Sequence, residues 1–283
     1  MIKTIVLVGV SVLLSRCLPD PLPVNSLPPL QPTIVVSSEL LPDSSVVVLI
    51  TNSFGALEAD DDSDPVALLN QIAINDATVI IEGGGVVDTL TLFGPGLYRT
   101  ESLPMDVTFE YELRVFSDEL GTVNATTQVR PRVAFSQLSA KINDTGFDTL
   151  ATINYSFQDG PGTSYYMVNV EKISTDALPA VGEFLNPSVF TNLLTDRAKT
   201  DGTFLTDSFN VLFQDDFTSG DTLLVQLGNI SPGYYDFLEL RRETRFNFSD
   251  FLGEPVNYPS NVKGGLGWFS LHFKDIRIII ISE

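Results

Sequence analysis

The 283-residue chain contains one cysteine, one histidine and one tryptophan, and its 16 lysines and arginines stand against 36 aspartates and glutamates. The single cysteine, Cys17, has no partner for a disulfide within the chain. The single histidine, His272, cannot build a histidine-based metal centre, and no second cysteine supplies further ligands. The net charge of −20 argues against nucleic acid as a partner, because phosphate contacts require clustered basic side chains.

The motifs of common catalytic and nucleotide-binding sites are missing as well. No Gly-x-Ser-x-Gly elbow accompanies His272. The glycine runs at 83–85 and 264–267 lack the spacing of a P-loop or a dinucleotide fingerprint. We therefore predict no catalytic residue and no cofactor, and a protein that is not an enzyme. The enzymatic alternative is a glycosidase-type pair of carboxylates, which sequence spacing alone does not locate.

The acidic run 60–64 alternates carboxylates as a calcium-binding loop does. However, Pro65 stands where such a loop has its glycine, and Gln71 where it has its last glutamate. We predict no metal site, with a solvated acidic loop as the simpler interpretation, and calcium binding by this run stays open.

The chain begins with a short apolar run that is typical of a secretory signal peptide. Residues 5–14 carry no charge and follow Lys3, and the run is too short to cross a bilayer. The sequence Leu-Ser-Arg-Cys at 14–17 is similar to a lipobox, at which bacterial lipoproteins are cut and acylated. We predict a signal peptide over 1–16 and lipidation of Cys17. Arg16 replaces the small residue expected before the cysteine, which leaves lipobox processing open; an ordinary signal peptide is the alternative.

A proline-rich segment follows the predicted lipidation site. Within 17–32 the chain has Pro19, Pro21, Pro23, Pro28, Pro29 and Pro32. Prolines at this density favour extended backbone over helix. We predict a lipid-anchored linker, and an arm packed along the first domain is the alternative.

The next hundred residues have a composition that is typical of short β-strands. Runs rich in β-branched residues at 33–37, 45–51, 77–82, 86–93, 97–99, 107–116 and 122–130 are bounded by turn formers. Within 107–116, Val107, Phe109, Tyr111, Leu113 and Val115 alternate with polar residues and are expected to share one face. A short helical turn is expected over 66–71. The pattern predicts a β-sandwich over 33–130.

The second block, 131–283, is less acidic than the first, which has no lysine after residue 16. Strands are expected at 136–142, 149–158, 164–173, 223–227, 268–273 and 276–281, the last one buried because it is almost purely apolar. Segment 186–199 is mixed and could hold a short helix. Ser231 and Pro232 are typical of a helix start, which predicts a helix over 234–245. The predicted fold is all-β, with two immunoglobulin-like or prealbumin-like sandwiches and a minor helix in the second.

Several motifs spread over the mature chain resemble one known family. The segment Gly-Pro-Gly-Leu-Tyr at 94–98 is similar to the ending of a small prealbumin-like or adhesin-like sandwich. The most specific segment lies at 260–269, where Ser-Asn-x-x-Gly-Gly-x-Gly precedes Trp-Phe. The residues that carry this resemblance are Gly96, Tyr98, Asn261, Gly264, Gly265, Gly267, Trp268 and Phe269. The chain resembles uncharacterised outer-membrane lipoproteins of Bacteroidota, the domain of unknown function 4249, often encoded beside TonB-dependent transporters.

This resemblance implies attachment to the outer membrane with exposure at the cell surface, and it carries over no catalytic residue. Together with the predicted lipid anchor, the two sandwiches and the missing catalytic motifs, it predicts a non-enzymatic accessory or ligand-binding partner of a TonB-dependent transporter. A free-standing glycan-binding or adhesion module is the alternative, and an exposed row of aromatic rings would favour it. Physically, the glycines at 264–267 favour an architectural role for the motif over a ligand site.

The tripeptide Asp-Thr-Leu occurs three times, centred on Thr89, Thr149 and Thr222. It resembles the O-glycosylation acceptor of exported Bacteroidota proteins. We therefore expect glycosylation of at least one of these threonines where its hydroxyl is exposed.

Overall fold

The computed structural model describes residues 31–54, 65–100, 103–160, 162–173, 190–195, 202–211, 217–245 and 257–283. Pro32–Glu283 forms one compact unit. Cys17, nearly all of the predicted linker and the acidic run 60–64 lie outside the described residues. In the described part, no helix combines the length and the apolarity needed to cross a membrane.

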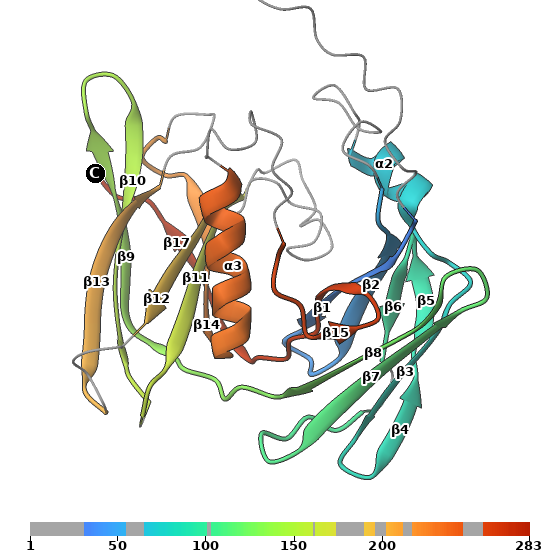
Figure 1. Ribbon diagram of the computed structural model, residues 1–283. Helices are drawn as coiled ribbons and strands as arrows, with labels where there is room; N and C mark the ends of the chain where they lie inside the picture. The colour runs from blue at the N-terminus through green and yellow to red at the C-terminus, as the bar shows by residue number, and fades with distance from the viewer. Residues whose placement is uncertain are drawn as a thin grey trace, which may run out of the picture. The chain divides into compact units, whose positions relative to one another are not determined.

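Two five-stranded sheets face each other in the first half of the unit (Figure 1). One sheet has the order β16 (Leu266–Trp268), β1 (Ile34–Leu40), β2 (Val46–Asn52), β6 (Leu97–Arg99) and β5 (Thr91–Gly94). The other has the order β15 (Val262–Lys263), β8 (Gly121–Gln128), β7 (Glu110–Ser117), β3 (Thr78–Gly83) and β4 (Val86–Thr89). A short helix, α2 (Pro65–Ile72), confirms the helical turn expected there.

The core of this first sandwich follows from alternation along its strands. In β7, Tyr111, Leu113 and Val115 are buried between the sheets. Val107 and Phe109, predicted to share their face, are exposed instead. The Asp106 carboxylate accepts hydrogen bonds from the Thr108 N–H and hydroxyl and so forms a turn, which delays the strand until residue 110.

The C-terminal segment returns to the first sandwich. The strand β16 pairs in parallel with β1, and β15 pairs with β8. Val262, Phe269 and Leu271 are therefore part of the first core. The sequence-based division had placed all of 131–283 in the second sandwich, because short glycine-rich strands carry no local signal of the distant edge that they pair with.

The second sandwich consists of a three-stranded and a four-stranded sheet. The first has the order β13 (Phe204–Val211), β10 (Thr149–Gln158) and β9 (Phe135–Asp144). The second has the order β12 (Phe190–Thr195), β11 (Tyr165–Ile173), β14 (Thr222–Ile230) and β17 (Lys274–Ile280). Aromatic rings dominate its core, including Tyr155, Phe157 and Tyr166. The sandwich-like arrangement of mostly antiparallel sheets confirms the predicted all-β class.

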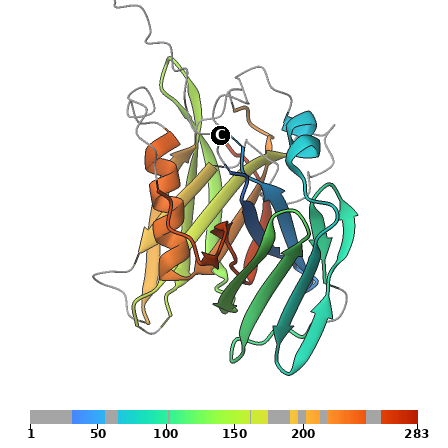
Figure 2. The same ribbon diagram turned by 45° about the vertical axis from the view of Figure 1, so that its right-hand side comes forward.

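The predicted helix in this half is α3 (Pro232–Arg245), which covers the outer face of the four-stranded sheet (Figure 2). The Ser231 hydroxyl accepts the Tyr234 N–H at 3.3 Å, so Ser231 caps the first turn as expected. Tyr235 and Leu238 lie on one face of the helix and pack against Met167 and Leu193 of the sheet. This small apolar cluster anchors the helix.

Two further expectations were wrong. The segment 190–195 forms strand β12 rather than a helix, because it pairs with β11. The strand β17 is the last in its sheet, and its Ile278 and Ile280 are 67% and 66% exposed. A pure hydrophobic run predicts burial on both faces, but an edge strand here buries only the face that carries Asp275, Ile279 and Ile281.

Asp275 is a fully buried carboxylate at the start of β17. It accepts the Phe135 N–H at 3.0 Å and the Arg277 guanidinium at 3.0 Å, and it forms an ion pair with Arg132. Burial by itself would raise the pKa of Asp275, but hydrogen bonds from Arg132, the Phe135 N–H and Arg277 outweigh it and hold the pKa below its usual range. Because the folded pKa is lowered, this carboxylate stabilises the fold above its usual pKa.

We expect Asp275→Ala to lower the free energy of unfolding by about 3 kcal/mol, because a buried N–H loses its acceptor and two guanidinium groups lose their counter-charge. Denaturant unfolding at pH 7 measures this loss. Asp275→Asn keeps an acceptor for Phe135 and should lose less. The difference from the wild type should shrink as the pH falls below about 4, where protonation removes the same contribution from the wild type. An Ala variant as stable as the wild type would contradict this role.

Candidate functional site

The signature segment 260–269 is held by the side chains of Ser260 and Asn261. The Asn261 amide donates to the Phe269 carbonyl at 2.8 Å and accepts the Phe269 N–H at 2.9 Å, so it replaces a strand-pairing partner. The Ser260 hydroxyl donates to the Gly267 carbonyl at 2.8 Å. These hydrogen bonds hold the loop in its conformation, so Ser260 and Asn261 have a structural role.

The glycines of this segment allow close contact with β1 and β8. A Cβ atom on Gly265 would lie 2.6 Å from the Ile34 carbonyl oxygen, and one on Gly267 would lie 2.0 Å from the Val36 carbonyl oxygen. Gly264 and Gly267 also have φ values of +81° and +90°, which favour glycine. Any side chain here would push β16 away from β1.

The other predicted motif residues, Gly96 and Tyr98, also have structural contacts. The Gly96 N–H donates to the Asn75 side chain at 2.7 Å, and its carbonyl accepts the Ile50 N–H. The buried Tyr98 hydroxyl donates to the Ile74 carbonyl at 2.9 Å and accepts the Ala77 N–H. Burial raises the pKa of Tyr98, so the hydroxyl stays neutral. The pair fixes the connection from α2 to β3 beside β6.

Four aromatic side chains meet where α3 approaches the signature segment: Tyr234, Phe237, Tyr258 and Trp268, called here the aromatic cluster. The ring centroids of Tyr234, Phe237 and Trp268 are 5.8–6.0 Å apart, and their planes lie within 33° of one another. The Tyr258 ring stands edge-on to Phe237 at 6.0 Å. Tyr258 is 42% exposed, and the other three are partly exposed. The sequence motif had identified Trp268 alone, because the other rings come from separate segments.

His272 lies at the inner side of this cluster, with its ring centroid 6.0 Å from that of Tyr234. Its Nδ1 lies 3.4 Å from the Ser270 hydroxyl, and both side chains are buried. Each of the two residues is only 2% exposed. In the described residues no group of three or more histidine, cysteine or acidic side chains is placed to hold a metal ion.

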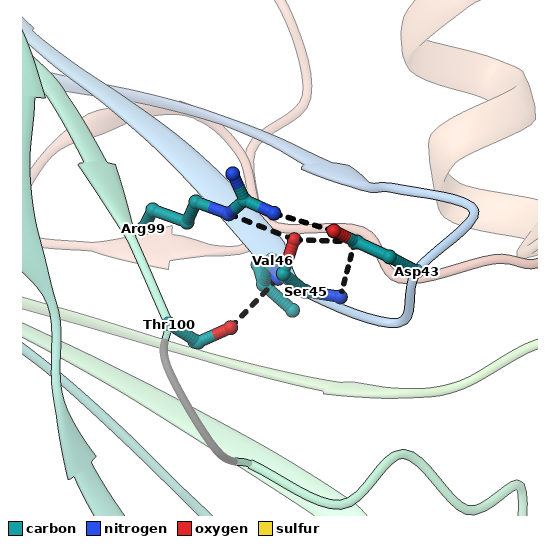
Figure 3. A network of polar contacts seen from close by, with 5 residues as sticks. All are labelled: Asp43, Ser45, Val46, Arg99 and Thr100. Atoms are coloured by element: carbon teal, nitrogen blue, oxygen red, sulfur yellow. Dashed lines mark hydrogen bonds and ion pairs between the residues drawn. The ribbon is translucent and has the colours of Figure 1, made fainter.

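A polar network occupies the turn between β1 and β2 in the first sandwich (Figure 3). The Asp43 carboxylate accepts the Ser45 hydroxyl at 2.6 Å and the Ser45 N–H at 3.0 Å, and it pairs with Arg99 of β6 at 2.5 Å. The Arg99 Nε also donates to the Ser45 hydroxyl at 3.0 Å. Hydrogen bonds from Ser45, followed by the charge of Arg99, hold the pKa of Asp43 below its usual range.

The same network borders a shallow hollow of about 500 Å³, lined in part by Thr91 and Thr100. The Thr100 hydroxyl accepts the Val46 N–H at 2.8 Å and so continues the pairing of the neighbouring strands. With its guanidinium already bound by Asp43 and Ser45, Arg99 has a structural role: it ties the turn to β6.

A row of isoleucines lies on the outer face of β17. Ile276, Ile278 and Ile280 alternate with core-facing residues and stand opposite Gln226, Leu224 and Thr222 of β14. We call this row the isoleucine edge. Its centre is exposed on the last strand of a sheet, a position at which natural proteins usually place charges or proline.

The three Asp-Thr-Leu threonines differ in exposure. Thr89 is exposed on β4, the outermost strand of its sheet. Thr149 at the start of β10 and Thr222 at the start of β14 are partly buried. The leucines after Thr89 and Thr222 are buried. Because successive side chains of an extended chain point to opposite faces, the side chains of these two threonines point away from the core that the leucines enter.

Comparison with known proteins assigns residues 21–274 to a family that is described as a domain of unknown function (DUF4249). The matched range includes the first sandwich, the signature segment and the second sandwich as far as the first residue of β17. No curated protein matches the chain.

The polar network gives a pH-dependent prediction. We expect Ser45→Ala to raise the pKa of Asp43 toward its ordinary value of about 4, because the hydroxyl and its hydrogen bond are lost. An NMR titration of the Asp43 carboxyl carbon measures the shift. Thr108→Val, which removes the equivalent hydroxyl beside Asp106, should leave Asp43 unchanged. An unaltered pKa of Asp43 in Ser45→Ala would refute the assignment.

Proposed function

This chain belongs to the DUF4249 family, and from that premise we propose that it is a non-enzymatic lipoprotein of the outer membrane. It is anchored through Cys17, faces the cell surface and works as an accessory, ligand-binding partner of a TonB-dependent transporter. The lipobox-like sequence and the preceding apolar run support the anchor. The family membership supports the comparison with lipoproteins that are encoded beside such transporters.

The observation that carries the partner role is the isoleucine edge. Burying a fully exposed isoleucine side chain contributes roughly 1.5–3 kcal/mol, so Ile278 and Ile280 together offer a substantial part of the free energy of a docking contact. Contiguous exposed apolar residues on a sheet edge promote aggregation unless a partner covers them. We therefore expect a partner to bury this edge in the native protein.

The geometry of the edge also favours a protein partner. The strand β17 pairs with β14 on one side, and on its other side the residue after it, Ser282, exchanges backbone hydrogen bonds with Ala140 and Ile142 of β9. The outward-facing side chains of Ile278 and Ile280 are therefore the part of the edge that a partner would cover, by offering apolar pockets to them. A transporter offers apolar surface of this kind.

Affinity isolation of the native protein from membranes in mild detergent tests the proposal. We expect a TonB-dependent transporter to be recovered in near-equal amount with the wild type, as measured by mass spectrometry. The double variant Ile278→Asp, Ile280→Asp should lose it, because the new carboxylates cannot be desolvated in the contact.

Val87→Asp provides a matched control, because Val87 is 58% exposed on β4, the outermost strand of another sheet. This variant should recover the transporter as the wild type does. Recovery of the wild-type protein alone, still bound to membranes, would show that the accessory role is wrong.

A second consequence of surface export concerns Thr89. We expect the native protein to carry a glycan there, because this threonine is the most exposed of the three acceptors. Intact mass spectrometry should show a mass above that of the lipidated polypeptide, and Thr89→Val should remove most of the excess while Thr149→Val removes little. A native mass equal to that of the lipidated polypeptide would exclude the modification.

A further inference from the structure

We infer that the aromatic cluster is a carbohydrate-binding site, at which its rings stack on the apolar faces of sugar rings. This inference deepens the proposed function. It rests on that function for one point, which is that the bound sugar is cargo for the transporter. The site itself requires no transporter. It lies on α3 and the signature segment and shares no residue with the isoleucine edge of β17.

The first argument is that these rings gather outside the sandwich cores. Phe237, Tyr258 and Trp268 belong to none of the buried clusters, and Tyr234 only borders the one beneath α3. Aromatic side chains are the largest apolar groups available, and leaving Tyr258 exposed and the other three rings partly exposed forfeits part of the free energy of their burial. A ligand that covers the rings recovers it.

The second argument is the orientation of the rings. The planes of Tyr234, Phe237 and Trp268 lie 13–33° from one another at similar centroid spacing, so the three rings form one apolar group instead of standing edge-on to each other. The face of an aromatic ring carries partial negative charge. The C–H groups on one side of a pyranose ring are partly positive and apolar, so they complement such a face.

The third argument is that the backbone is shaped to hold the rings. A Cβ atom on Gly233 would lie 2.7 Å from the Trp268 ring, so the tryptophan rests directly on the first turn of α3. The Tyr258 hydroxyl shares a hydrogen bond of 2.7 Å with Thr244 near the end of the same helix. Both ends of the cluster are therefore fixed to α3 before a ligand arrives, which lowers the entropy cost of binding.

One polar side chain that can serve sugar hydroxyls lies on the same side of α3 as two of the rings. Arg241 is exposed, and its spacing from Tyr234 and Phe237 places the three on one side of α3. A guanidinium provides several N–H donors in a fixed plane. A few directed polar groups next to an apolar surface are typical of small-ligand sites.

The experiment uses the full-length native protein in detergent, freed of any transporter. A panel of soluble hexasaccharides built from glucose, mannose, xylose, galactose or N-acetylglucosamine is added while tryptophan emission is recorded. Trp268 is the only tryptophan, so the emission reports on this cluster alone. We expect at least one member to bind saturably and to shift the emission, with isothermal calorimetry giving the Kd.

Two variants identify the site. Tyr258→Ala removes a stacking ring, and Gly233→Ala displaces Trp268 while favouring the helix; each should weaken binding about tenfold. Tyr258→Phe keeps the ring and should retain most of the affinity. Phe147→Ala is the matched control, because Phe147 is 96% exposed but lies in the turn between β9 and β10.

Binding to no member of the panel, or affinity unchanged in both Tyr258→Ala and Gly233→Ala, would overturn the inference. Binding of planar aromatic compounds in place of sugars would overturn it too. The result is independent of the transporter experiment, because the aromatic variants leave β17 intact and the isoleucine variants leave the rings intact. Loss of one property with retention of the other therefore shows which proposal fails.

Discussion

The buried carboxylate of Asp275 is the interaction on which the arrangement of this chain depends. It binds the N–H at the beginning of β9 and the arginines on both sides, so the segment that leaves the first sandwich is fixed to the one that enters the last strand. Just before it, the Arg130 N–H donates to Leu271 and the Phe273 N–H donates to Arg130. A nearly buried ion pair between Lys274 and Glu39 of β1 lies at the same crossing.

These contacts hold two crossing segments side by side. They therefore determine where the residues before and after the crossing lie. Residues 257–273 complete the first sandwich and present Tyr258 and Trp268 to α3. The strand β17, which follows, closes the sheet on which α3 lies. The positions of the aromatic cluster and of the isoleucine edge thus both follow from the same return of the chain.

Much of the fold was predictable from local patterns. Alternation identified the buried face of β7, and Ser231 with Pro232 identified the start of α3. Pairing between distant segments was not predictable, because the two-residue strand β15 and the three-residue strand β16 depend on edges that lie more than a hundred residues earlier. The apolar run at 276–281 predicted a strand correctly and its burial wrongly, because composition does not show which strand ends a sheet.

The candidate sites divide in the same way. Trp268 was identified by its motif, and the spacing of Tyr234 and Phe237 on one helix was available in the sequence. Their meeting with Tyr258 depends on the tertiary contact between α3 and the signature segment, which no spacing encodes. Gly233 carried no signal at all, since its lack of a side chain matters only once Trp268 lies against it.

The late return of the chain also has a consequence for assembly. β1 and β8 obtain their last neighbours only from residues 262–268, so neither sheet of the first sandwich can finish until nearly all of the polypeptide has emerged. Pairing over such sequence distances is slow, because a long loop must close before any contact forms. A chain that begins to fold from its N-terminus therefore carries two open strand edges until residues 262–268 arrive, and a truncation of the C-terminus would leave both edges open.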